Sequence, residues 1–186
     1  MIEANKVTVL YGKAGTSKTQ IAVYTALNLF FTRQTEKVYI LRPAVAMEDL
    51  GFMPGGVEEK LGFYFVPVKQ SLYKMLDKAK VDKLFLDRDV EIVPVAFIQG
   101  ITLDDVLICD EVENMTEKQI RMLLTRLGKG GKMILTGDTN QVMLKDPSKS
   151  GFSKLLSLCG QVEGFGCMEL KTNYRDPFVE EVLKHY

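Results

Sequence analysis

The chain has 186 residues, about the size of one domain, and its 46% hydrophobic and 26% charged residues are typical of a globular protein. The 24 basic and 24 acidic residues balance, which argues against nucleic-acid binding through a strongly basic surface but leaves room for a local basic stripe. No stretch reaches the roughly 20 apolar residues of a membrane span, and residues 1–6 lack the regions of a signal peptide. We therefore expect one cytoplasmic domain over residues 1–186, without membrane association.

The cysteines give little sign of a covalent or metal-bound framework. Cys109, Cys159 and Cys167 are odd in number, contain no Cys-x-x-Cys pair and are accompanied by one histidine, His185. The sequence thus predicts neither a disulfide framework nor a zinc site. Cys109 ends an apolar run, which favours a small buried hydrophobic residue.

Predicted strands and helices alternate along the chain. The first unit is a strand at Lys6–Tyr11, a turn containing glycine, a helix at Lys18–Phe31 and a second strand at Lys37–Leu41. The later predicted elements are a loop-rich segment at 44–67, helices at 66–80, 116–127, 153–158 and from Pro177, a short apolar segment at 91–97, and strands at 105–109, 132–136 and 166–170. This order predicts an α/β protein, a three-layer α/β/α sandwich with a mostly parallel sheet. Ligands of such sheets bind at the carboxyl ends of the strands.

A phosphate-binding motif lies between the first strand and the first helix. Its sequence matches G-x-x-x-x-G-K-T except that Ser17 replaces a glycine, and the residues expected to bind nucleotide are Gly12, Lys13, Ala14, Gly15, Thr16, Ser17, Lys18 and Thr19. Lys18 is predicted to reach the β- and γ-phosphate oxygens, and the Thr19 hydroxyl to bind Mg²⁺. A plain strand-to-helix turn is the alternative. A serine at position 17 would either crowd the phosphates or turn its side chain outward.

Two acidic residues end the buried strand at 105–109, in the arrangement of a Walker B motif. Asp110 is predicted to hold Mg²⁺ together with Thr19, because a divalent cation bound to phosphates needs further oxygen ligands. Glu111 is predicted to orient or deprotonate the attacking water. Alternatively, Glu111 and Glu113 form a solvated acidic cap at the start of a helix.

Two later segments complete the candidate site. Residues 136–141, Thr-Gly-Asp-Thr-Asn-Gln, follow a strand, and Gln141 is predicted to sense the γ-phosphate or its water. An ordinary turn is the alternative. Arg175 follows the last strand and is predicted to stabilise charge on the transferring phosphoryl group, in its own subunit or in a neighbour's. A surface salt bridge explains that arginine equally well.

The motifs together resemble those of the PhoH-like ATPases over almost the whole chain. Besides residues 12–19, the resemblance lies in residues 42–45, 50–60, 96–103, 110–111, 124–126 and 136–141. It implies a RecA-like core similar to the first motor domain of superfamily one helicases, with ATP and Mg²⁺ as ligands and ATP hydrolysis as the reaction. It also implies RNA or single-stranded nucleic acid as a partner, and the host cytoplasm if the chain is a minimal phage-type member.

The chain departs from the family pattern in three ways. Ser17 replaces a glycine. From the resemblance we also expect the chain, with about five residues before its first strand, to lack the segment that helps hold adenine in relatives and the second motor domain of the helicases. A homo-oligomer that completes the site is therefore one hypothesis. A nucleotide-binding scaffold or regulatory module with little turnover is the alternative function. Arg42 is expected either to contact nucleic acid or to brace the region of Glu58.

Overall fold

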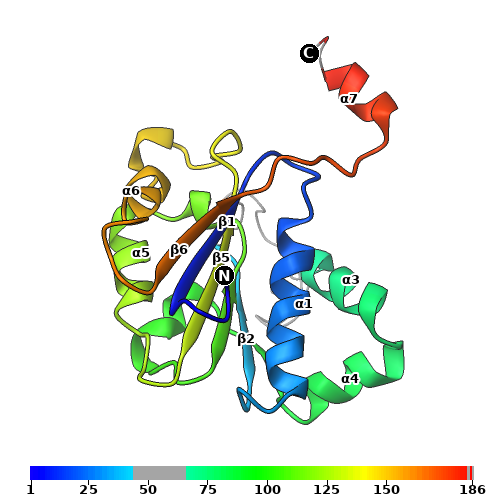
Figure 1. The fold of residues 1–186 in the computed structure, drawn as a ribbon, viewed down its shortest axis with the longest axis vertical. Helices are drawn as coiled ribbons and strands as arrows, with labels where there is room; N and C mark the ends of the chain where they lie inside the picture. Colours follow the sequence, from blue (N-terminus) through cyan, green and yellow to red (C-terminus); the bar gives the residue numbers. More distant parts are fainter. Residues whose placement is uncertain (44–65, 184, 186) are drawn as a thin grey trace, which may run out of the picture.

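The fold is built on a six-stranded parallel sheet. The computed structural model describes residues 1–43, 66–183 and 185. The strands are β1 (Val7–Tyr11), β2 (Val38–Leu41), β3 (Val90–Ile92), β4 (Val106–Cys109), β5 (Lys132–Gly137) and β6 (Phe165–Glu169). Their order across the sheet is β3-β2-β4-β5-β1-β6, and every neighbouring pair is parallel. The predicted α/β fold with a mostly parallel sheet is confirmed (Figure 1).

Helices cover both faces of the sheet, which explains why its central strands are mostly buried and apolar. On one side lie α1 (Lys18–Phe31), α3 (Val66–Met75) and α4 (Lys78–Leu86), and on the other α5 (Glu117–Leu124) and α6 (Phe152–Ser157) (Figure 1). All four residues of β4 are buried. Successive side chains of a strand point to opposite faces, so Leu107 and Ile108 enter two different apolar clusters. Strands buried on both faces are the rule in parallel sheets.

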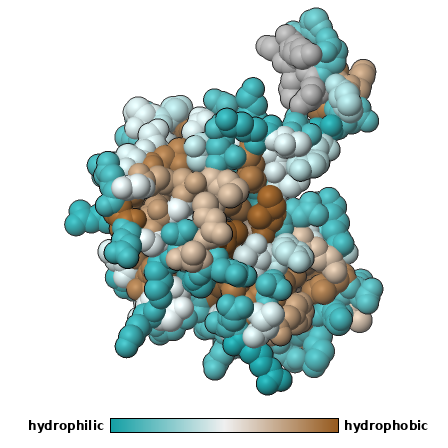
Figure 2. All heavy atoms as spheres, viewed as in Figure 1, coloured by the Kyte–Doolittle hydropathy of each residue, from teal (hydrophilic) through white to brown (hydrophobic). Residues whose placement is uncertain are grey.

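The C-terminal helix α7 (Pro177–Leu183) projects away from this body (Figures 1 and 2). Figure 2 also shows apolar side chains near the middle of the viewed face, where the edge strand β6 runs. In the described part of the chain, no helix is long and apolar enough to cross a membrane.

The middle of the chain differs from the prediction in its helices. A single helix was expected over residues 66–80, but α3 ends at Met75 and α4 begins at Lys78, after Asp77 in the N-cap position. The expected helix therefore combined the whole of α3 with the first turn of a second helix. Charged residues alternate with apolar ones in the first half of α4, and the helix buries Val81 and Leu84, so its apolar periodicity is weak. The three-residue strand β3 is also short enough to escape a pattern search.

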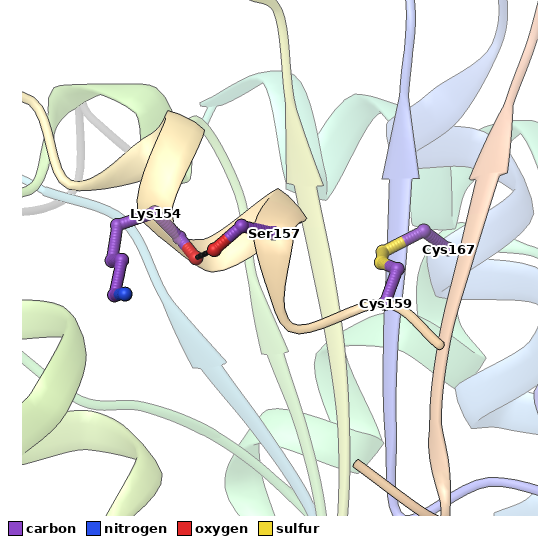
Figure 3. Close-up of a disulfide and its surroundings, with 4 residues drawn as sticks. All are labelled: Lys154, Ser157, Cys159 and Cys167. Atoms are coloured by element: carbon purple, nitrogen blue, oxygen red, sulfur yellow. Dashed lines mark hydrogen bonds between the residues drawn. A yellow bond between two sulfur atoms is a disulfide. The ribbon is translucent and has the colours of Figure 1, made fainter. Parts of the chain in front are cut away.

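A disulfide joins Cys159 to Cys167, contrary to the expectation from the sequence (Figure 3). It ties the turn that follows α6 to the edge strand β6. Between the two cysteines the chain reverses through Gly160 and Gly164, which both have positive φ, and this brings the two Cα atoms to 5.9 Å. That separation lies within the normal range for a disulfide. The absence of a Cys-x-x-Cys pair was therefore no argument against pairing across a longer turn. Cys109 is free and buried, as predicted.

Candidate nucleotide-binding site

The predicted site residues follow different strands whose carboxyl ends share one edge of the sheet. Tyr11, the last residue of β1, is level with Gly137 of β5 and Glu169 of β6, and Cys109 of β4 is level with Leu135 of β5. The chain leaves these positions into the P-loop (residues 12–19), the Asp110 turn, the 137–143 loop and the 170–176 segment. This is the edge at which ligands bind in open α/β sheets.

The P-loop closes around the side chain of its own lysine. Lys18 Nζ donates hydrogen bonds to the backbone oxygens of Gly12 at 2.7 Å and Lys13 at 2.9 Å. The buried Thr16 hydroxyl donates to the same Lys13 oxygen at 2.9 Å. A phosphate that binds Lys18 would therefore have to replace the two backbone oxygens. Burial lowers the pKa of the Lys18 ammonium, and the negative charges of Asp138, Glu113 and Asp110 oppose that shift.

Ser17 takes a backbone conformation that favours glycine. Its φ is 61° and its ψ is 23°, in the left-handed region, and its side chain makes no capping hydrogen bond to α1. This conformation costs an L-residue roughly 1–2 kcal/mol, whereas glycine adopts it freely. The glycine of the usual motif is thus replaced at a position where the backbone itself favours glycine.

The Ser17→Gly variant is expected to unfold at higher urea concentration, with a gain in unfolding free energy of about 0.5–1 kcal/mol. The gain is the relief of left-handed strain, less the extra chain entropy that glycine loses on folding. Urea denaturation followed by circular dichroism measures it. Ser153→Gly, at an exposed position within α6, is the matched control and should lose stability. If the Ser17→Gly protein is no more stable than the parent, the Ser17 backbone is not strained.

Asp110 is held by two threonine hydroxyls. Asp110 is 5% exposed, and its Oδ1 accepts a hydrogen bond from Thr19 Oγ1 at 2.8 Å and a second from Thr136 Oγ1. The contact between Thr19 and Asp110 unites the two residues predicted to hold the metal. Thr136 was missed as a site residue, although its position at the end of β5 beside Gly137 was a usable signal.

The Thr19 and Asp110 pair fits a Mg²⁺ site. The Thr19 hydroxyl donates its hydrogen bond to Asp110, so the lone pairs of the hydroxyl oxygen stay available to a cation. Hydroxyl, carboxylate and phosphate oxygens are the ligands that Mg²⁺ prefers. Thr19 and Asp110 would hold the ion together with the nucleotide.

Glu111 is ion-paired to Arg42 at the end of β2. The two side chains come from positions 69 residues apart, and the Glu111 backbone is left-handed with φ 58°. Residues other than glycine in the left-handed region are common at functional sites. The expected alternatives for Arg42 were nucleic acid and the region of Glu58. The structure gives it Glu111 as a partner, while Glu58 lies outside the described residues.

Glu113 is not part of a solvated cap, and that alternative is wrong for this residue. It lies in a short 3-10 helix, Val112–Asn114, and is 3% exposed. Burial raises the pKa of its carboxyl group to about 8, with smaller contributions in the same direction from Glu111 and Asp110. The nearby backbone N–H groups of Glu113 and Asp138 act against that shift. The neutral form of this carboxyl group is therefore favoured near neutral pH.

The loop after β5 places one acid inward and the predicted sensor outward. Asp138 is buried and accepts a hydrogen bond from Asn140 N at 2.9 Å. Gln141 is exposed, and its backbone N–H donates to Asp138 O at 3.3 Å. The structure thus puts Gln141 on the loop that adjoins the P-loop. Its contact with a γ-phosphate stays a prediction.

Arg175 lies against the P-loop of its own chain. Tyr174 N donates to Gly15 O at 3.0 Å, and a Cβ placed on Gly15 would come within 2.3 Å of Asn173 Oδ1 and 2.6 Å of Arg175 Cγ. The Arg175 guanidinium is near enough to lower the pKa of Lys18. The arginine therefore reaches the nucleotide site from within the same subunit.

A family model described as "PhoH-like protein" matches residues 1–186. The chain belongs to the PhoH-like family. It is a P-loop NTPase on this ground, and nucleotide binding is a property of that class. The resemblance that the motifs indicated is confirmed.

Curated relatives of the PhoH-like chain are about twice its length. A PhoH-like protein of Mycobacterium bovis is 35% identical over 189 residues, with 100% of this chain and 54% of the relative covered. A PhoH-like protein of Bacillus subtilis strain 168 is 38% identical over 179 residues, covering 94% of this chain and 56% of the relative. The chain thus spans about half the length of the curated relatives it matches.

The fold is similar to that of a bacteriophage terminase. The large terminase of a thermophilic bacteriophage has a TM-score of 0.61 at 12% identity, with 100% of this chain and 46% of the terminase covered. This similarity supports the RecA-like P-loop fold.

Proposed function

We propose that this PhoH-like chain binds MgATP at residues 12–19 and hydrolyses its γ-phosphate. The hydrogen bond between Thr19 and Asp110 carries the proposal, because it joins the P-loop to the acid after β4 at the place where a nucleotide-bound Mg²⁺ would lie. Asp110 is also buried and held by Thr136, so it is fixed before any ligand arrives. Such preorganisation reduces the cost of binding.

Each charged side chain of this site has its own role in phosphoryl transfer. Lys18 binds the β- and γ-phosphate oxygens, and a Mg²⁺ ion held by Thr19 and Asp110 would supply further positive charge to the phosphates. Glu111 orients the attacking water and accepts its proton once Arg42 has released the carboxylate. Arg175, with its stem against Gly15, stabilises the charge that develops on the transferring group.

The partner in this proposal is RNA or single-stranded nucleic acid. The support is the likeness of the Walker, Gly-Asp-x-x-Gln and Tyr-Arg elements to those of superfamily one helicases. Phosphate release measured with and without RNA and single-stranded DNA tests it. Stimulation by either polymer supports the nucleic-acid partner, whereas unchanged turnover with both contradicts it and leaves a plain ATPase.

Lys18→Ala is expected to weaken MgATP binding by about 10- to 100-fold and to remove turnover. One charge-assisted hydrogen bond contributes about 1.5–3 kcal/mol, and the ammonium provides such bonds to the phosphates. Calorimetry with MgATP measures the affinity, and Lys154→Ala, an exposed lysine of α6 outside the loop, is the control. Equal affinities of Lys18→Ala and the parent would contradict the proposed site.

A nucleotide-binding module with little turnover is the second candidate. Ser17 favours it, because its left-handed backbone replaces the usual glycine, and so does the closed arrangement of Lys18 on Gly12 and Lys13. This candidate predicts MgATP binding without phosphate release. If Ser17→Gly then gained turnover, Ser17 would be identified as the cause.

A further inference from the structure

The buried carboxyl group of Glu113 lies next to the nucleotide site but has no part in the steps above. Among the described residues, its Oε2 has no hydrogen-bond partner. A Cβ placed on Gly137 would lie 3.0 Å from that oxygen, so the carboxyl group is packed directly against the start of the 137–143 loop. A buried polar atom without a partner costs free energy, and it calls for an explanation.

The charged groups around Glu113 come from several elements. Lys18 approaches from α1, Asp110 and Glu111 from the end of β4, and Asp138 from the end of β5. The carboxyl group therefore interacts electrostatically with Lys18 and packs against the start of the loop that carries Gln141.

The neighbouring residue supports the far end of the same loop. Asn114 is buried, and its Oδ1 accepts a hydrogen bond from Met143 N at 2.7 Å. The backbone oxygen of Glu113 accepts from Ser150 Oγ at 2.6 Å, which holds the short helix in place. Two consecutive side chains thus meet the two ends of one loop.

We propose that Glu113 is a positioning residue: with Asn114 it holds the 137–143 loop in register with Lys18, so that the loop responds to the terminal phosphate of the nucleotide. This inference rests on the proposed function. When a γ-phosphate draws Lys18 from the Gly12 and Lys13 oxygens, the charge facing Glu113 moves, and the loop packed against Glu113 moves with it. Glu113 acts through the loop and touches no reacting atom.

Hydrogen exchange of residues 138–143 tests the proposal in the full chain. Without nucleotide, Glu113→Ala should raise the exchange rates of this loop about tenfold, because its support is lost. Glu113→Gln keeps the shape and the neutral form, so its rates should stay within about twofold of the parent. Asn114→Ala should raise the exchange rates at the Met143 end of the loop. This variant replaces Glu113→Ala in the test if Glu113→Ala fails to fold. Glu163→Gln, at an exposed position, is the control.

Steady-state kinetics of ATP hydrolysis distinguishes a positioning role of Glu113 from purely structural support of the 137–143 loop. Glu113→Ala should lower kcat for ATP hydrolysis about tenfold or more with KM within about twofold, and Glu113→Gln should restore it. MgATPγS should protect the loop more than MgADP in the parent and in Glu113→Gln, but equally in Glu113→Ala. Unchanged loop exchange in Glu113→Ala and Asn114→Ala would overturn the proposal. If MgATP protects no part of residues 12–19, the proposed function fails instead, and the nucleotide-free comparison still decides the role of Glu113.

Discussion

Glu111→Gln is expected to lower kcat for ATP hydrolysis by about 10²- to 10⁴-fold, the usual contribution of a general base. Glutamine keeps the length of the side chain but cannot accept the proton of the attacking water. Affinity for MgATP should stay within about threefold, because the phosphates are bound by the P-loop. Phosphate release under single-turnover conditions measures the first quantity, and calorimetry measures the second.

Arg42 complicates the interpretation of that experiment and also supplies its control. The ion pair with Arg42 holds Glu111 in the structure, so a glutamine at position 111 loses this partner as well as the base. Arg42→Ala breaks the same ion pair but keeps the carboxylate, and it should retain turnover within about tenfold of the parent. Glu117→Gln, an exposed residue at the start of α5, controls for loss of an acid nearby. Equal turnover of Glu111→Gln and the parent would remove Glu111 from the reaction.

The P-loop and the central strands could be predicted from local sequence, since a short segment fixes each of them. The P-loop motif lies between an apolar run and an amphipathic segment, and the structure places β1 and α1 there. The four apolar residues before Asp110 form β4, a strand buried on both faces. Because parallel strands end at one edge, the meeting of Thr19 with Asp110 followed from the fold class alone.

Contacts between distant segments could not be predicted in the same way. The partner of Glu111 lies 69 residues away at Arg42, and a charge at the end of a strand gives no sign of which opposite charge will meet it. The Asp-Glu-Val-Glu-Asn run looks solvated, yet the packing of the 137–143 loop buries Glu113. The Cys159 and Cys167 disulfide likewise depends on how tightly the chain turns after α6.

The stability of the protein is expected to fall as the pH rises from about 4.5 to about 8, through the Glu113 carboxyl group. Burial raises its pKa in the folded state from 4.5 to about 8. Between these values the folded chain holds a proton that the unfolded chain releases, so unfolding becomes easier as the pH increases. A pKa that differs by one between the folded and unfolded states corresponds to about 1.4 kcal/mol, which makes the full loss on the order of 5 kcal/mol. Below pH 4.5 the group is neutral in both states and the loss disappears.

Glu113→Gln isolates this effect, because glutamine stays neutral at every pH. Relative to the parent, the unfolding free energy of Glu113→Gln should rise steadily from about pH 4.5 to about pH 8 and level off above it. Urea denaturation at intervals across that range measures the difference, and taking differences removes the titration of groups common to both proteins. Glu163→Gln, exposed and remote from the site, should show no such rise. A constant difference between Glu113→Gln and the parent across the range would show that Glu113 is ionised in the folded protein. The carboxyl group would then need a cationic partner, and Lys18, whose charge interacts with Glu113, is a candidate.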